Sequence, residues 1–271
     1  MKLPEESRCV IVGAARNVEK DIEKTFLTLS QAFTCFNSLE FLIIESFSTD
    51  NTANVLENLT TKYENFAFES ITDLDFTLTS RTKRIASARN FALSRLKTKK
   101  SQIDYVVVAD LDGVNKHLTL DSVKSCWDYD DWDAIFANQQ GFYYDIWALR
   151  HPSWNPNDCW RDYENMIPLI GRRKAFQFSV KSRMIELKSD TLVKVDSAFG
   201  GLGIYTSKAF FSSEYLGVFE GREICEHVPF NLNLTRNNFK LFINPKLVNL
   251  KRRKLSSIVA SIMNYKYYLR A

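Results

Sequence analysis

Two aspartates, Asp110 and Asp112, stand directly after an apolar run, at a spacing that could hold a metal ion. The run, Tyr105–Ala109, is rich in aromatic and β-branched residues, which is typical of a strand buried on both faces. Side chains at the carboxyl end of such a strand lie where an open α/β sheet binds its ligands. Oxygen ligands suit Mg²⁺ or Mn²⁺ with coordination positions left for a diphosphate. We therefore predict a divalent-cation site at these two aspartates.

The same spacing occurs a second time, at Asp73 and Asp75. These residues follow a short, mixed run and precede Thr, Ser and Arg residues, so we interpret them as part of a solvated loop. The spacing alone is therefore a weak signal, and an ordinary acidic turn is the alternative interpretation of Asp110 and Asp112.

The elements that position these aspartates alternate along the first part of the chain. Apolar runs predict strands, and apolar residues at three- and four-residue steps predict helices. The predicted strands cover 9–13, 39–44, 66–71 and 104–109, and the predicted helices cover 17–36, 51–62 and 84–97. This order predicts an α/β fold with a mainly parallel central sheet flanked by helices.

The alternation is lost after Trp127. Residues 139–163 are dense in aromatic residues and Pro, and a glycine cluster follows at 200–203. Later elements are predicted at 134–137 (strand), 207–211 and 226–237 (helices) and 240–243 (a strand closed by Asn244 and Pro245). Because no repeat or low-complexity linker interrupts the chain, we expect one domain over 1–250. Its halves are a nucleotide-binding part, 1–115, and an acceptor part, 116–250, and a basic and apolar tail follows at 251–271.

The composition excludes several classes of protein. A formal net charge of +4 does not favour a general nucleic-acid partner. Five cysteines, odd in number and without a C-x-x-C pair, argue against a disulfide framework or a zinc site and favour a reducing compartment. The polar amino terminus has no pattern of a signal peptide, and no apolar run approaches the ~20 residues that span a bilayer. We therefore expect a cytoplasmic protein.

Five stretches, in this order, resemble the nucleotide-sugar glycosyltransferases of the GT-A fold, particularly the inverting family 2 and its bacterial polysaccharide-building relatives. The stretches are 10–17, 42–52, 84–90, 108–112 and 225–230. The resemblance implies a Rossmann-like GT-A fold, a nucleotide-diphosphate sugar as donor, and Mn²⁺ or Mg²⁺ as cofactor. It also implies transfer of the sugar, with inversion, to a glycan or lipid-linked acceptor in surface polysaccharide synthesis.

The resemblance also assigns donor-binding roles. It places Ala14 and Arg16 in the turn that binds the nucleobase, and Asp110 beside the ribose hydroxyls or a metal-bound water, with Asp112 as the direct metal ligand. The donor-binding residues implied in this way are Ala14, Arg16, Glu45, Arg84, Arg89 and Asp110. The fork geometry of Arg84 and Arg89 suits phosphate contact. For Glu45, a helix-capping turn is the alternative.

The chain departs from the family pattern at three positions. Glu45 stands where an aspartate is usual, and Phe47 replaces a glycine in the next turn. Glu226 and His227 stand where the family carries an acidic pair that includes the base. We take Glu226 as the first candidate for the general base. His227 is then either a third metal ligand or the base itself, which leaves the base and the inversion open.

The acceptor is expected to bind on the aromatic region. Tyr144, Trp147 and Trp154 could stack against sugar rings, although filling a second small core is the alternative for such residues. Asp196, Gly200 and Gly201 lie where the family's acceptor loop approaches the sugar, and a plain turn explains the glycines equally well.

Two other functions fit parts of the pattern. A sugar nucleotidyltransferase would need a glycine-rich loop after the first strand, and residues 13–17 lack that set of glycines. A glycan-binding module without catalysis would not need Asp110, Asp112 and Glu226.

The tail has four basic residues before an apolar stripe: Lys251, Arg252, Arg253 and Lys254. This pattern predicts peripheral contact with the inner face of a membrane. Packing of the stripe on the protein is the alternative.

Overall fold

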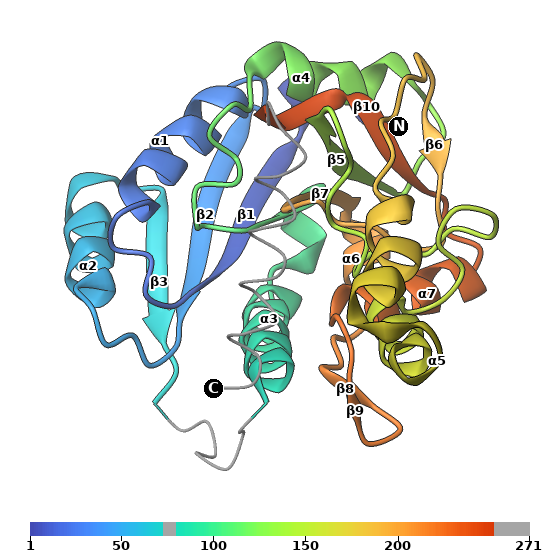
Figure 1. The fold of residues 1–271 in the computed structure, drawn as a ribbon. Helices are drawn as coiled ribbons and strands as arrows, with labels where there is room; N and C mark the ends of the chain where they lie inside the picture. Colours follow the sequence, from blue (N-terminus) through green and yellow to red (C-terminus); the bar gives the residue numbers. More distant parts are fainter. Residues whose placement is uncertain (73–79, 252–271) are drawn as a thin grey trace.

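The computed structural model describes residues 1–72 and 80–251, and the chain forms an eight-stranded sheet within these residues (Figure 1). The strand order is β3-β2-β1-β4-β7-β5-β10-β6, and β8 and β9 form a separate hairpin. The strands are β1 (Arg8–Ala15), β2 (Ser38–Glu45), β3 (Phe66–Ser70), β4 (Tyr105–Ala109), β5 (Ala134–Gln140), β6 (Val193–Lys194), β7 (Leu202–Thr206), β8 (Val218–Phe219), β9 (Arg222–Glu223) and β10 (Leu241–Lys251). The predicted α/β architecture with a mostly parallel sheet is confirmed.

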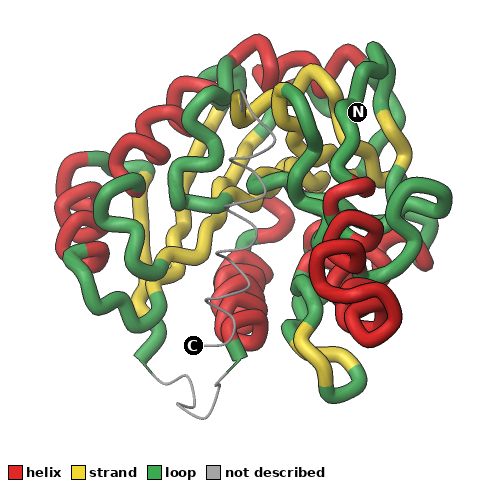
Figure 2. The backbone as a smooth tube through the Cα atoms, viewed as in Figure 1, coloured by secondary structure: helices red, strands yellow, loops and turns green. Residues whose placement is uncertain are grey.

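Helices pack on both faces of this sheet (Figure 2). They are α1 (Ile22–Ala32), α2 (Thr52–Lys62), α3 (Arg81–Lys97), α4 (Leu120–Lys124), α5 (Cys159–Ser179), α6 (Ser207–Phe210) and α7 (His227–Arg236). Apolar residues of α1, α2 and α4 pack on one face, and those of α3, α6 and α7 pack on the other. Each face of the sheet thus has its own hydrophobic core, and β4 contributes to both. Val106 and Val108 pack in one core, and Tyr105 and Val107 pack in the other. None of the described helices is long and apolar enough to cross a membrane.

The first four strands in the order, β3 to β4, are parallel to one another. The predicted helix over 17–36 is wrong at both ends, because α1 covers only Ile22–Ala32. Asn17 has a φ of 53°, which a right-handed helix does not accept, and its amide N–H donates to Ser48 Oγ instead. The turn after β1 is therefore longer than periodicity predicted.

The rest of the sheet is mixed. β7 pairs antiparallel with both β4 and β5, β10 is parallel to β5, and β6 is antiparallel to β10 at the edge. The prediction that the last strand closes at Asn244 and Pro245 is wrong, because β10 continues to Lys251. A register shift between Ile243 and Val248 accommodates the proline, which cannot donate to the sheet.

Helix α5 was not predicted from the sequence. Pro168 lies inside it, and Gly171, with a φ of 76°, divides it into two helical segments at a kink. Asp158 caps the amino terminus by accepting from the amides of Trp160 and Arg161. Aromatic residues of α5 pack with those of the preceding loop around a small third core of Ile146, Cys159, Val180 and Met184.

Two predictions lie partly or wholly outside the described residues. These are the second acidic pair at Asp73 and Asp75, and the tail beyond Lys251. The five cysteines are all free, as their scattered positions predicted.

Candidate active site

A cleft of about 660 Å³ opens beside the carboxyl end of β4. Its wall combines the end of β4, one side of α3, the aromatic loop before α5, and the start of α7. The lining residues include Arg81, Arg89, Asp110, Asp112, Lys116, Tyr144, Asp145, Trp147, Trp160, Phe199, Cys225, Glu226, His227 and Lys251. The structure therefore brings seven of the predicted site residues together: Arg89, Asp110, Asp112, Tyr144, Trp147, Glu226 and His227.

Asp110 is fixed by its backbone. Its amide N–H donates to Gly201 O at 2.9 Å, and its carbonyl oxygen accepts from Asn115 Nδ2 at 2.8 Å. The side chain is 38% exposed and faces the cleft. Its surroundings still remove much of its hydration, so burial raises the pKa of Asp110 to about 7, with Asp112, Glu226 and Asp145 adding to the rise and Arg89 opposing it.

Arg89 is the buried cation at the centre of the site. Its Nη2 lies 3.1 Å from Asp110 Oδ1, and its Nε lies 3.1 Å from Glu226 Oε1. The guanidinium also lies over the ring of Phe199, 5.1 Å from the centroid. Burial alone would lower the pKa of Arg89, but the charges of Glu226 and Asp110 raise it by more than burial lowers it. The side chain therefore stays charged. Arg89 thus ties α3 to the ends of both β4 and the 225–227 turn.

Glu226 and His227 start α7, and both are buried. The imidazole of His227 stacks on Phe199 with 3.6 Å between ring centroids, and its Nε2 lies 3.5 Å from Glu226 Oε1. Neither ring nitrogen has a hydrogen-bond partner among residues 1–72 and 80–251. Burial, then the charge of Arg89, lowers the pKa of His227 well below its ordinary value, so the ring is neutral at pH 7.

The donor set for a divalent cation is a pair of carboxylates. Among the described residues, no group of three or more His, Cys, Asp or Glu side chains is placed to hold a metal, so Asp110, Asp112 and His227 do not form a ready three-ligand site. Burial raises the pKa of Asp112 as it does that of Asp110, because desolvation penalises the charged carboxylates in the absence of a cation. Mg²⁺ commonly binds through one or two carboxylates plus substrate phosphates, and this pair fits that mode.

Four predicted donor-binding residues do not line the cleft: Ala14, Arg16, Glu45 and Arg84. Glu45 is 5% exposed, and its Oε1 accepts from the amide of Ser48 at 2.7 Å, so it holds the turn after β2. Phe47 in that turn has a φ of 51°, at the position where the family carries a glycine. Burial lowers the pKa of Arg84, and Arg16 and Arg81 lower it further, which places three guanidinium groups near one another beside the start of α3.

The remaining acceptor candidates also lie off the cleft wall. Trp154 donates its indole N–H to Arg183 O at 2.6 Å and packs edge-on against Tyr143. Asp196 pairs through its backbone with Arg150. Gly200 and Gly201 have φ values of 67° and 88°, and a Cβ at either would lie within 2.7 Å of Ala137 O or Val114. Their lack of side chains is therefore required by the protein's own packing.

Sequence reasoning did not single out Asp145, Trp160, Phe199 and Asn115. Asp145 is the only acidic residue within the aromatic segment 142–150, a signal that could have identified it. Asn115, Gln139 and Asn249 form a buried amide chain that holds the carbonyl oxygens of Asp110, Gly200 and Gly201. No local pattern marks these amides, because their partners are distant in sequence.

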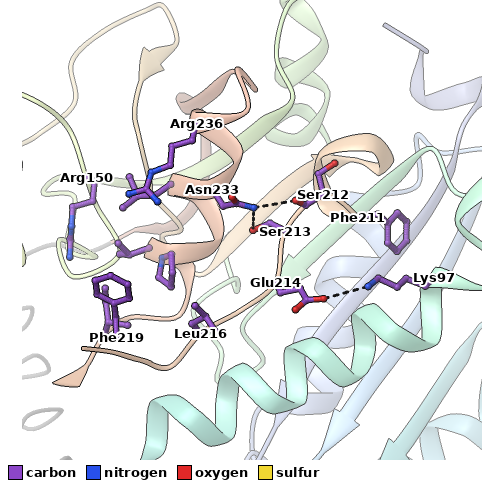
Figure 3. A pocket seen from close by; sticks show the side chains of 14 residues that line it. Lys97, Arg150, Phe211, Ser212, Ser213, Glu214, Leu216, Phe219, Asn233 and Arg236 are labelled. Carbon is purple, nitrogen blue, oxygen red and sulfur yellow. Dashed lines mark hydrogen bonds and ion pairs between the residues drawn. The ribbon is translucent and has the colours of Figure 1, made fainter. Parts of the chain in front are cut away.

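A second cavity of about 640 Å³ lies between α7 and the segment 211–224 (Figure 3). An ion pair between Lys97 and Glu214 (3.6 Å) and hydrogen bonds from Asn233 to Ser212 and Ser213 lie along it. None of the predicted site residues lines this cavity. The cleft beside the carboxyl end of β4 is therefore the better candidate for the active site.

The profile of glycosyl transferase family 2 matches residues 9–186, so the chain belongs to this family. No curated protein matches the chain significantly. Among solved structures, a mannosyltransferase, PcManGT from Pyrobaculum calidifontis in complex with GDP-Man and Mn²⁺, is similar with a TM-score of 0.55 and 14% identity. The similarity covers 94% of this chain and 60% of that one.

S. aureus TarS is similar as well. Its complex with UDP has a TM-score of 0.52 and 14% identity, over 94% of this chain and 63% of TarS 1-349. A complex of the same protein with UDP-GlcNAc gives a TM-score of 0.51. The chain therefore spans about 60% of the length of the similar solved structures, and the likeness at this identity establishes the shared GT-A fold.

Proposed function

We propose that this chain is a metal-dependent glycosyltransferase that moves a sugar from a nucleotide-diphosphate donor to a glycan or lipid-linked acceptor. The observation that carries the proposal is the cleft at the end of β4, which brings Asp110 and Asp112 together with Arg89 and Glu226. Family membership supports the reaction class. The solved neighbours support the donor class, since their complexes contain GDP-Man or UDP-GlcNAc.

The donor binds, in this proposal, with its diphosphate between the acidic pair and the three clustered guanidinium groups. Asp112 and Asp110 would hold Mn²⁺ or Mg²⁺, which when bound stabilises negative charge on the leaving diphosphate. Arg16, Arg81 and Arg84 lie close enough to affect one another electrostatically. Their combined positive potential favours the binding of a polyanion at this edge of the sheet. Arg89 keeps Asp110 oriented rather than reaching the phosphates itself.

Glu226 is the proposed general base. An inverting transfer needs a base within hydrogen-bond reach of the acceptor hydroxyl, and Glu226 lies in the wall of the cleft. Arg89 holds its carboxylate in place through Nε, 3.1 Å from Oε1, and the imidazole of His227 lies beside it, with Nε2 3.5 Å from Oε1. The neutral, stacked imidazole gives Glu226 an apolar flank, and its lowered pKa makes His227 the weaker candidate for the base.

Surface polysaccharide or glycolipid synthesis is the proposed setting. If the acceptor is lipid-linked, the basic segment from Lys251 would bring the cleft to the inner face of a membrane, and Lys251 itself lines the cleft. Flotation with anionic liposomes at low salt tests this contact. The full chain should float and a chain ending before Lys251 should not; equal behaviour of the two removes the membrane contact from the proposal.

A sugar nucleotidyltransferase and an inactive glycan-binding module stay as alternatives. Thermal shift with a panel of nucleotide sugars, with and without Mn²⁺, tests the donor class. We expect one class of nucleotide to raise Tm only when Mn²⁺ is present, in the wild type but not in Asp112→Asn. Stabilisation by a nucleoside triphosphate and a sugar phosphate instead would favour the nucleotidyltransferase.

A further inference from the structure

We propose that Asp145, together with Tyr144, Trp147 and Trp160, forms a subsite that binds one pyranose ring of the acceptor through a hydroxyl group. The proposal rests on the proposed function and adds to it a residue that contacts the acceptor. These four side chains line the same cleft as Asp110 and Glu226. They come from the aromatic loop and the first turn of α5, and Asp145 is close enough to Asp110 and Glu226 to interact with both electrostatically.

The carboxylate of Asp145 is held in a fixed direction. Its Oδ2 accepts the amide N–H of Gly200 at 2.9 Å, and Gly200 is itself fixed because its carbonyl oxygen accepts from Gln139 and Asn249. The side chain is only partly buried and faces the cleft, so part of the carboxylate remains available to a ligand. A charged oxygen fixed at a cleft wall is a strong acceptor for a hydroxyl donor.

The loop that carries Asp145 is held by hydrogen bonds from its own side chains. Asn155 donates to the carbonyl oxygens of Ile146 and Leu149, both at 2.7 Å. The guanidinium of Arg150 donates to Trp147 O at 3.0 Å and to Leu149 O, and it pairs with Asp158 at 3.1 Å. Because side chains within the loop satisfy its carbonyl groups, the subsite is formed before any ligand arrives, and binding does not have to order it.

The aromatic side chains around Asp145 are fixed as well. Trp147 donates its indole N–H to Asp158 Oδ2 at 3.0 Å, which sets the direction of its ring. Trp160 packs edge-on against Tyr163, with 5.9 Å between ring centroids, at the start of α5. Flat aromatic faces beside one charged acceptor match a sugar ring, whose apolar C–H face stacks while its hydroxyl groups form hydrogen bonds.

The charge of the subsite distinguishes acceptor from donor. Asp145 interacts unfavourably with Glu226 and Asp110, and Arg89 partly offsets these carboxylates. A further anion such as the donor's diphosphate would be repelled here, whereas a neutral ligand with hydroxyl donors would not. The ligand class that fits is therefore an uncharged pyranose.

The test uses the full chain with Mn²⁺ and a nucleoside diphosphate, and methyl pyranosides as probes in saturation-transfer NMR. We expect Asp145→Asn, which keeps an acceptor for the Gly200 amide, to weaken binding of the bound pyranoside about tenfold, and Asp145→Ala to weaken it further. The matched control is Asp130→Asn, an exposed aspartate outside the cleft, which should bind as the wild type does.

A second measurement separates this inference from the proposed function. Release of nucleoside diphosphate from the donor in the absence of acceptor should be detectable in the wild type and equal in the control Asp130→Asn. If the wild type releases diphosphate but binds every probe as well as Asp145→Asn does, or binds none, the subsite is wrong and the transferase proposal stands. If the wild type releases no diphosphate, the proposed function itself fails.

Discussion

In residues 1–115 each strand of the order β3-β2-β1-β4 is parallel to its neighbour, whereas residues 116–251 insert the antiparallel β7 and a long aromatic loop. The first part is held by regular helix and sheet packing on two cores. The second part depends on buried polar side chains that bond to distant backbone groups. The main examples are Asn155, Asn231 and Ser197, which are all fully buried.

The two parts meet at Arg89, and this contact explains where the cleft lies. Arg89 belongs to α3 in the first part, and it pairs with Asp110 of the same part and with Glu226 of the second. The regular part supplies the metal pair at a strand end, where geometry is set by the sheet. The irregular part supplies the base and the acceptor wall, where geometry is set by individual hydrogen bonds.

The largest effect that separates the two parts is expected for Glu226→Gln. If Glu226 acts only as the base, kcat should fall about 10²- to 10⁴-fold while donor affinity changes little, since proton transfer alone is lost. Steady-state kinetics and donor titration measure both, with Tm as a control for folding. Inversion at the anomeric carbon should be seen by NMR, and retained configuration would overturn the assignment of the base.

The contact between the two parts is tested by Arg89→Met. Removing this cation leaves Glu226 buried and unpaired, so we expect a loss of about 3–5 kcal/mol in the free energy of unfolding. Arg95→Met is the matched control, because Arg95 pairs with Glu69 at 2.7 Å with side chains 53% and 36% exposed. That exposed pair should cost less than about 1 kcal/mol. Similar losses in urea denaturation would show that Arg89 does not join the two parts.

The different construction of the two parts is tested by a pair of asparagine substitutions. Asn155→Leu removes three hydrogen bonds in the second part, including one accepted from Arg183, so we expect a cost of about 3 kcal/mol. Asn65→Ala removes one exposed bond to Leu39 O in the first part and should cost about 1 kcal/mol or less. A larger cost for Asn65→Ala in chemical denaturation would contradict the comparison.

The smallest effect concerns pH. Burial raises the pKa of Asp110 to about 7, above the ~3.9 of an unfolded aspartate. The folded protein therefore binds more protons than the unfolded chain between these values, and this contribution to stability is present at pH 4 and lost as the pH rises through 7. Between pH 5 and 8, the Tm of the ligand-free wild type should therefore fall relative to the Tm of Asp110→Asn. A constant difference would mean that Asp110 does not titrate in this range.

The sequence predicted the first part better than the second for a physical reason. Apolar runs and their polar ends mark β4 and Asp110 locally, so both could be identified from neighbouring residues. Helix α5 was missed because Pro168 and Gly171 interrupt its pattern, and the extent of β10 was missed because Pro245 is accommodated by a register shift. Asp145 gains its position from Gly200, which is remote in sequence.

The same reasoning applies within the predicted site. Asp110, Asp112, Glu226 and His227 do line one cleft, but periodicity could not show that Arg89 would be committed to two carboxylates. Likewise, Trp154 matches the composition of the acceptor wall, yet its indole is used to hold Arg183 O. Which aromatic residue faces a cleft depends on tertiary contacts.

The most direct test of the central claim is product analysis with purified protein, Mn²⁺ and the nucleotide sugar selected by thermal shift. The account predicts that wild type releases nucleoside diphosphate, that excess EDTA stops the release, and that Asp112→Asn is slower by about 10³-fold while folding normally, because loss of the metal removes several kcal/mol of charge stabilisation. Release of diphosphate at equal rates by wild type and Asp112→Asn, or full activity in excess chelator, would contradict it.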